Sequence, residues 1–128
     1  MRGKMVKTKT SFNKRKASVT AKQAPVGMVV LITARDIDEA EKISSHLLEQ
    51  KLIACANIIP GIQSLFWWQG KIDKAKEVLL VIKTKGNLFA KIVPAVKSVH
   101  SYDVPEIIAL PIIDGYQTYL RWLNESVQ

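Results

Sequence analysis

The sequence predicts an α+β fold, a ferredoxin-like βαββαβ sandwich with a long central β-hairpin and a C-terminal helix. Two stretches with helical periodicity alternate with β-branched runs, and two of those runs are long and joined by a short turn. An amphipathic helix buries one side only, so two such helices need a sheet to cover. A four-stranded antiparallel sheet with both helices on one face uses every predicted element.

The positive charge of the chain is confined to its beginning. Residues 1–25 contain eight Lys and Arg and no acidic residue, whereas residues 26–128 contain eleven basic and eleven acidic residues. We therefore expect a disordered basic tail over residues 1–25 and one folded domain over residues 26–128. The tail also has the composition of an organelle targeting segment, although an inert extension is the favoured interpretation. A formally neutral domain argues against a specific nucleic-acid partner.

Cysteine count and hydropathy predict where the protein works. No run approaches the roughly 20 apolar residues that span a bilayer, so we expect no membrane span. Cys55 is the only cysteine, which excludes an internal disulfide and favours a reducing compartment. The expected location is the cytoplasm, or an organelle if residues 1–25 are a transit peptide.

The first part of the domain is predicted to form a strand followed by a helix. Gly27 to Ala34 is a short β-branched run, typical of a buried strand. Asp36 is a candidate cap for a helix that runs from Ile37 to near Lys51. Its apolar face comprises Ile37, Ala40, Ile43, Leu47 and Leu48, and its polar face comprises Asp38, Glu39, Glu41, Lys42, Glu49 and Gln50.

A long hairpin follows. Residues 53–68 are β-prone with an expected bend at Pro60 and Gly61, and Gln69 and Gly70 turn the chain into a second strand over residues 71–84. Residues 78–82, VLLVI, show no polar alternation. We expect them to be buried on both faces of the sheet.

The last third repeats the helix and strand pattern. Gly86 and Asn87 are expected to end the strand and cap a helix whose apolar face includes Leu88, Phe89, Ile92, Val93 and Val96. Pro94 within it predicts a kink or an early end. A loop over residues 100–103 leads to a strand over residues 105–112 and, after Gly115, to a closing helix.

The two central strands are about twice the usual length. An arm of this kind leaves apolar surface uncovered in a monomer, including two adjacent tryptophans beside its turn. We therefore expect a homo-oligomer in which each arm packs on a neighbouring subunit.

Several stretches together resemble the CutA divalent-cation tolerance family. They are LITA at 31–34, KLIACANIIPGI at 51–62, the Ser64, Trp68 and Gly70 spacing, Glu77 with Leu80, Lys83 with Thr84, HSYDVPEI at 100–107, and Gly115 with YLRW at 119–122. The resemblance implies a homotrimer joined through the long hairpins and a role with copper and other divalent ions. It also implies a trimer like that of PII signalling proteins, and animal members have been linked to the anchoring of acetylcholinesterase.

The chain departs from the family pattern at two positions. Ser101 stands where the loop often has proline, and Phe66 stands where the arm often has tyrosine. The loss of that phenol removes one polar group from the expected cleft between subunits, which puts a ligand role for position 66 in doubt.

Four residues are the expected metal ligands: Cys55, His100, Asp103 and Glu106. A thiolate suits soft ions such as copper(I), and imidazole with carboxylate suits borderline divalent ions. A lone cysteine on a strand is more often a small buried apolar residue than a metal ligand, and this is the alternative. No pair has the close spacing of a zinc motif, so Cu²⁺ or another divalent ion would need ligands from two subunits.

Three further residues are expected to line the same cleft for a bound small molecule: Lys83, Tyr102 and Trp67. Lys83 follows an apolar run, so its stem can stay buried while its charge reaches the cleft, although pairing within the chain is the alternative. Trp67 and Trp68 alternate faces, with Trp68 expected between subunits and Trp67 at the cleft mouth.

The function expected from these features is divalent metal binding, with copper first, that contributes to metal tolerance. The alternative is a trimeric small-molecule sensor or a protein-anchoring scaffold. We do not expect an enzyme, because no activated nucleophile, phosphate-binding glycine loop or cofactor fingerprint is present.

Overall fold

The computed structural model describes residues 26–128, so the predicted tail over residues 1–25 lies outside the described residues. The predicted element order is confirmed. The elements are β1 (Gly27–Ala34), α2 (Ile37–Glu49), β2 (Cys55–Trp68), β3 (Lys71–Thr84), α3 (Phe89–Lys97), β4 (Ile107–Ile112) and α4 (Gln117–Glu125).

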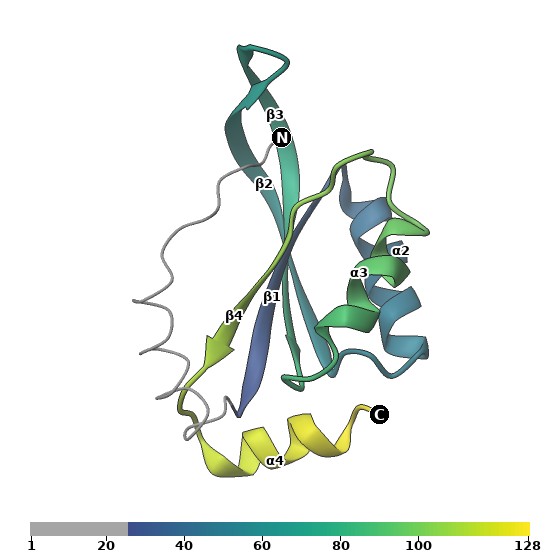
Figure 1. Ribbon diagram of the computed structural model, residues 1–128, viewed down its shortest axis with the longest axis vertical. Helices are drawn as coiled ribbons and strands as arrows, with labels where there is room; N and C mark the ends of the chain where they lie inside the picture. The colour runs from purple at the N-terminus through teal and green to yellow at the C-terminus, as the bar shows by residue number, and fades with distance from the viewer. Residues whose placement is uncertain (1–25) are drawn as a thin grey trace, which may run out of the picture.

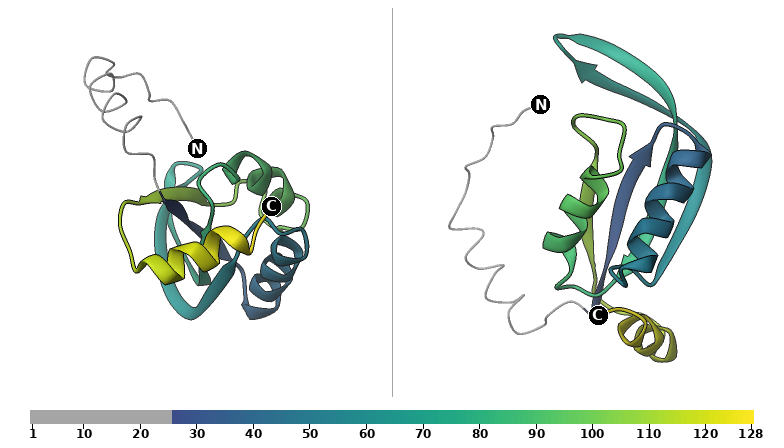
Figure 2. Two further views of the ribbon diagram at one scale, coloured as in Figure 1. Left: turned by 90° about the horizontal axis from the view of Figure 1, so that it is seen from below. Right: turned by 90° about the vertical axis from the view of Figure 1, so that its right-hand side faces the viewer.

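The four strands form one sheet in the order β2-β3-β1-β4, and each neighbouring pair is antiparallel. Helices α2 and α3 lie side by side on one face of the sheet, and α4 crosses its end (Figures 1 and 2). The tip of the β2-β3 hairpin projects beyond both helices as an arm (Figure 1). Apart from α4 at the end that it crosses, no helix of residues 26–128 lies on the opposite face of the sheet, which we call the helix-free face.

The hydrophobic core lies between the sheet and the helix layer. Alternate residues of β1 and β3 point toward the helices, and Val30, Ile32, Leu80 and Ile82 are fully buried there. They meet Ile43 and Leu47 of α2 and Ile92 and Val96 of α3, which are equally buried.

The expectation that residues 78–82 are buried on both faces is wrong for a single chain. Leu79 and Val81 are only half-buried. Their side chains point away from α2 and α3, to the helix-free face, which no helix or strand of residues 26–128 covers at this point.

The two main helices begin differently. Asp36 caps α2 as predicted, because its side chain accepts a hydrogen bond from Glu39 N (2.9 Å). The predicted cap at Asn87 is wrong: Leu88 N donates to Lys85 O (3.4 Å), so Gly86 and Asn87 form a turn that precedes the helix. Pro94 is tolerated inside α3, which ends three residues later at Lys97.

A tight turn at the tip and a β-bulge in β2 determine the geometry of the arm. Gln69 and Gly70 both have positive φ (52° and 80°), as a two-residue hairpin turn requires. The register shifts between Ile59 and Ile62, where β2 carries one extra residue around Pro60 and Gly61. Before the bulge, the odd-numbered residues of β2 therefore lie on the helix-free face. Beyond the bulge, the even-numbered residues lie on that face.

Thr84 joins the end of β3 to the segment before β2, and we expect Thr84→Val to destabilise the fold. The side chain is fully buried and its hydroxyl donates to Leu52 O (2.6 Å). Valine keeps the shape but leaves the carbonyl without this donor, which costs about 1–3 kcal/mol of the free energy of unfolding. Urea denaturation measures the change. Thr118→Val, at an exposed position of α4, is the control, and an equal effect in both variants would contradict the assignment.

Candidate functional site

The predicted site residues gather at two places along β3. Cys55 pairs with Lys83 at one end of the strand, whereas Tyr102 contacts Glu77 six residues away. Six residues of strand span about 20 Å. One chain therefore does not bring Cys55 and Tyr102 to the same ligand.

The first place, which we call the strand-end cluster, contains Cys55, Asn57, Lys83 and Tyr119. The Lys83 ammonium donates to Asn57 Oδ1, and the thiol of Cys55 lies 3.9 Å from the same oxygen. Burial and the neighbouring Cys55 thiol raise the pKa of Tyr119. The cluster gathers a half-buried thiol, an amide, a cation and a phenol on the helix-free face of the sheet.

The second place, the loop cluster, centres on His100, whose side chain is fully buried. Its Nε2 donates to Thr33 O (2.8 Å) and its Nδ1 accepts from Tyr102 N (3.0 Å). Since Nδ1 accepts, the ring is neutral with its proton on Nε2. Both nitrogens are thus used to hold the loop, and metal ligation by His100 would require one of these bonds to break.

Glu39 fixes this loop to α2. Its carboxylate accepts from Arg35 N (2.8 Å) and from Ser101 N (2.7 Å) and lies 3.9 Å from His100 Nδ1. Burial alone would raise the pKa of Glu39, but the hydrogen bonds from Arg35 and Ser101 outweigh it and the net direction is downward. The prediction that Glu39 belongs to the polar, solvent-facing side of the helix is therefore wrong.

Tyr102 connects the loop to β3. Its hydroxyl donates to Glu77 Oε2 (2.6 Å), and burial together with this bond raises the pKa of Tyr102. Burial and the nearby Glu77 carboxylate raise the pKa of Glu106. Glu77 and Glu106, which we call the carboxylate pair, are thus near enough for the charge of one to act on the other, while Asp103 is exposed.

The remaining predicted residue, Trp67, lies far from both clusters. It pairs with Ile72, which lies five residues before Glu77 in β3, toward the tip of the arm. Because of the bulge, its side chain points to the same side of the sheet as the helices. Between residues 26 and 128, no group of three or more His, Cys, Asp or Glu side chains is arranged to hold a metal ion. The four expected ligands stay a prediction that needs a second chain.

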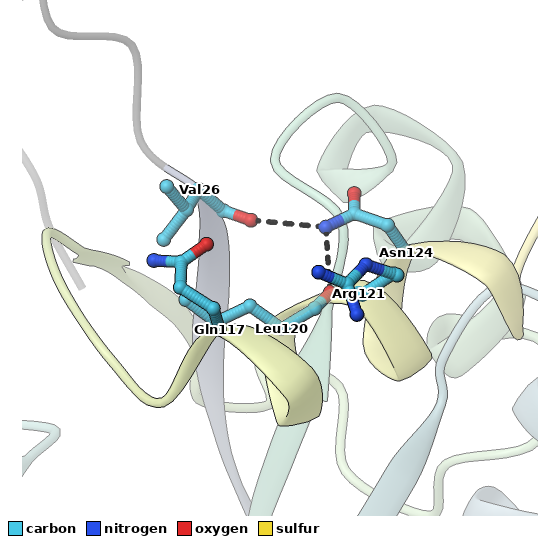
Figure 3. Close-up of a pocket in the computed structure, with 5 residues that line it drawn as sticks. All are labelled: Val26, Gln117, Leu120, Arg121 and Asn124. Atoms are coloured by element: carbon cyan, nitrogen blue, oxygen red, sulfur yellow. Dashed lines mark hydrogen bonds between the residues drawn. The ribbon is translucent and has the colours of Figure 1, made fainter.

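Of two surface hollows in the described part of the chain, one is lined by residues of the loop cluster and the other is not. One of about 440 Å³ lies on the helix side above the loop cluster and includes Arg35, Glu39, Lys42 and His100. The other, of about 300 Å³, lies between α4 and the start of β1 (Figure 3). There Asn124 donates to Val26 O (3.4 Å) and Leu120 O (2.9 Å), and none of the predicted site residues lines it.

Residues 28–126 match the model of the CutA1 divalent ion tolerance protein family. The chain belongs to the CutA1 family. This confirms the resemblance inferred from the sequence, and it covers all the elements that build both clusters.

Relatives agree in sequence and in fold. The divalent-cation tolerance protein CutA of Archaeoglobus fulgidus is 46% identical over 77% of this chain and 96% of its own length. The chloroplastic Protein CutA 1 of Oryza sativa subsp. japonica is 43% identical over 79% of this chain, which spans 57% of that protein. The solved structure of the Thermus thermophilus Cut A1 protein superposes with a TM-score of 0.78 at 44% identity, covering 80% of this chain and 99% of that one.

Compartments differ among these CutA relatives. The rice protein is chloroplastic, and the solved A. fulgidus structure (TM-score 0.77, 45% identity, 80% of this chain and 99% of that one) is described as periplasmic. In the part of this chain that the structure describes, no helix has the length and apolar character needed to cross a membrane.

Glu39 and Glu77 are the structural residues of the loop cluster that were not predicted as site residues. Glu39 could have been found from its spacing, because Asp36 followed three residues later by glutamate is a capping-box pattern. Glu77 carries no such local signal, since its partner Tyr102 lies 25 residues further along the chain.

We expect Glu39→Gln to lower the free energy of unfolding by about 2 kcal/mol, since the charged acceptor of two partly buried backbone hydrogen bonds, from Arg35 N and Ser101 N, is lost. Because the pKa of Glu39 is lowered from its ordinary 4.5, its contribution is full above about pH 4.5 and is lost as pH falls further. Denaturation at several pH values tests both points. The exposed Glu41→Gln is the matched control, and an acid-induced loss of stability of the same size in wild type and Glu39→Gln would refute the role.

Proposed function

We propose that this protein binds divalent metal ions, with copper the first candidate, and contributes to metal tolerance as a homotrimer. The family assignment supports metal tolerance, since the matching family and the relative from A. fulgidus carry that description. The homotrimer, the copper preference and the ligands go beyond that description. They rest on the uncovered face of the sheet and on the donor side chains near it.

The feature that carries the proposal is the uncovered apolar face of the sheet. Register aligns Leu110, Val29, Lys83 and Cys55 in one row and Ile108, Leu31, Val81 and Asn57 in the next, all pointing away from the helices. Ile108 and Leu110 are 48% and 49% exposed. An apolar surface that spans four strands favours association with further copies of the chain.

Association through this face supports a shared site. The strand-end cluster lies at one end of the face and Glu77 near the other, about 20 Å apart along β3. Packing three copies against one another allows the thiol of one chain to approach the carboxylate pair of the next. A ligand set divided between subunits would explain why no single chain assembles one among its described residues.

The donor chemistry favours copper among the divalent ions. Cys55 supplies a soft sulfur ligand of the kind that copper prefers, and Glu106 with Asp103 would supply carboxylate oxygens that complete a mixed ligand set. Lys83 and Tyr102 would complete the surroundings of the ion or of a small molecule. We propose no catalysis and a cytoplasmic location, which organelle targeting through residues 1–25 would change.

Copper titration tests the ligands. We expect Cys55→Ser and Glu106→Gln each to weaken copper binding about tenfold or more, as loss of a metal ligand or its support does. His100→Gln keeps a donor for Thr33 O and separates ligation from support of the loop. Glu125→Gln at the end of α4 is the control for general charge loss.

Unchanged copper affinity in all three variants would remove these residues from the site. A metabolite retained by the purified protein, with only weak and unspecific copper binding, would support the small-molecule sensor instead.

Light scattering tests the assembly. We expect a mass three times that of the 14.3 kDa chain, and we expect Trp68→Asp to reduce it, because a charge would be buried in the contact between subunits. Tyr116→Asp alters a side chain that is 75% exposed and lies outside the strands, and it should leave the mass unchanged. A monomeric wild type would contradict both the assembly and the shared site.

A further inference from the structure

The helix-side face of the arm tip exposes three large apolar side chains. Trp67 and Ile72 are paired across the hairpin, and Leu65 lies on the same face two residues before Trp67. Leu65, Trp67 and Ile72 are 69%, 71% and 66% exposed, more than most other large apolar residues of the described chain. We call these three residues the tip patch.

Two lysines follow the tip patch on the same face. Lys74 pairs with Leu65, and Lys76 pairs with Gln63, so both alternate onto the side of Trp67 and Ile72. Both are exposed, and among residues 26–128 no carboxylate forms an ion pair with either. The face thus changes from apolar at the tip to cationic behind it.

The opposite face of the arm differs. Phe66 and Trp68 are less exposed, at 39% and 41%, and the face includes Asp73, which pairs with Phe66. This is the continuation of the helix-free face, through which we propose that subunits associate. The tip patch points away from that face.

We propose that the tip patch docks onto the surface of an anionic lipid bilayer. Pairs of residues on one face of a hairpin are separated by about 7 Å. With the tip patch at the boundary between headgroups and acyl chains, roughly 5–10 Å deep, Lys74 and Lys76 reach the level of the phosphates. Tryptophan is also the residue that prefers this depth. This inference goes beyond the proposed metal binding and does not require it.

The shape and composition of the tip favour a lipid surface over a protein partner. The arm is a convex projection that extends past the helices (Figures 1 and 2). A protein would need a matching groove, whereas a fluid bilayer adapts to a projection. Lysine is also depleted in the cores of protein interfaces but favoured beside anionic lipid.

Vesicle co-sedimentation of the full chain tests the proposal, with phosphatidylcholine vesicles prepared with and without phosphatidylserine. We expect binding to the anionic vesicles to fall about tenfold or more in Leu65→Ser/Trp67→Ser/Ile72→Thr, because buried apolar area sets much of the affinity. Ile113→Ser/Tyr116→Ser removes two apolar residues elsewhere that are still more exposed (86% and 75%) and is the control for loss of exposed apolar surface. The eight positive charges of residues 1–25 are identical in all variants, so they cannot produce a difference.

Tryptophan fluorescence gives a second measurement that does not depend on the triple variant. The difference between wild type and Trp67→Phe isolates Trp67, whose emission should shift to the blue and be quenched by brominated lipid when anionic vesicles are added. Equal vesicle binding by wild type and the triple variant, or no change in Trp67 emission, would overturn the proposal. A lower assembled mass for the triple variant would also overturn it, since the patch would then be a contact between subunits.

Discussion

The structure depends on one constraint: two helices cover one face of a sheet whose central strand is much longer than they are. Beneath the helices, β3 supplies Leu80 and Ile82 to a fully buried core. The same strand presents Leu79 and Val81 to a face that the described residues leave open, and no helix of residues 26–128 lies against either side of its first half. A fold of this kind is stable because of its core, while its uncovered strands are available for association.

The buried polar groups of the loop cluster stabilise the loop within the candidate site. His100 and Glu39 are almost fully buried, and their hydrogen bonds tie the loop to the end of β1 and to the first turn of α2. Tyr102 extends the network to Glu77 on β3. Buried groups this fully satisfied fix one arrangement of the loop, and the hydrogen bond from Tyr102 holds the Glu77 side chain against it.

The fold was predictable from the sequence where the signals are local. The run at β1, the cap at Asp36 and the turn at Gln69 and Gly70 are each determined by neighbouring residues, and all are confirmed. Burial was less predictable, because a charged residue such as Glu39 is assigned to solvent unless its distant partner is known.

The site was predictable in residue type but not in arrangement. The closeness of His100, Asp103 and Glu106 in sequence suggested one ligand group, yet the partners of this loop are Thr33, Glu39 and Glu77 from distant elements. For Trp67, strict alternation from Cys55 would give the same face. The extra residue near Pro60 reverses that relation.

The bulge also limits how the arm can change in length. The turn at Gln69 and Gly70 sets the register of the tip, while the core sets the register near Cys55, and the extra residue at Pro60 and Gly61 absorbs the difference. An insertion or deletion of one residue beyond the bulge would exchange the faces of Trp67 and Trp68. Arms of other lengths are therefore reached by adding or removing residues on both strands together, and such paired changes are the ones to seek when engineering a longer or shorter arm.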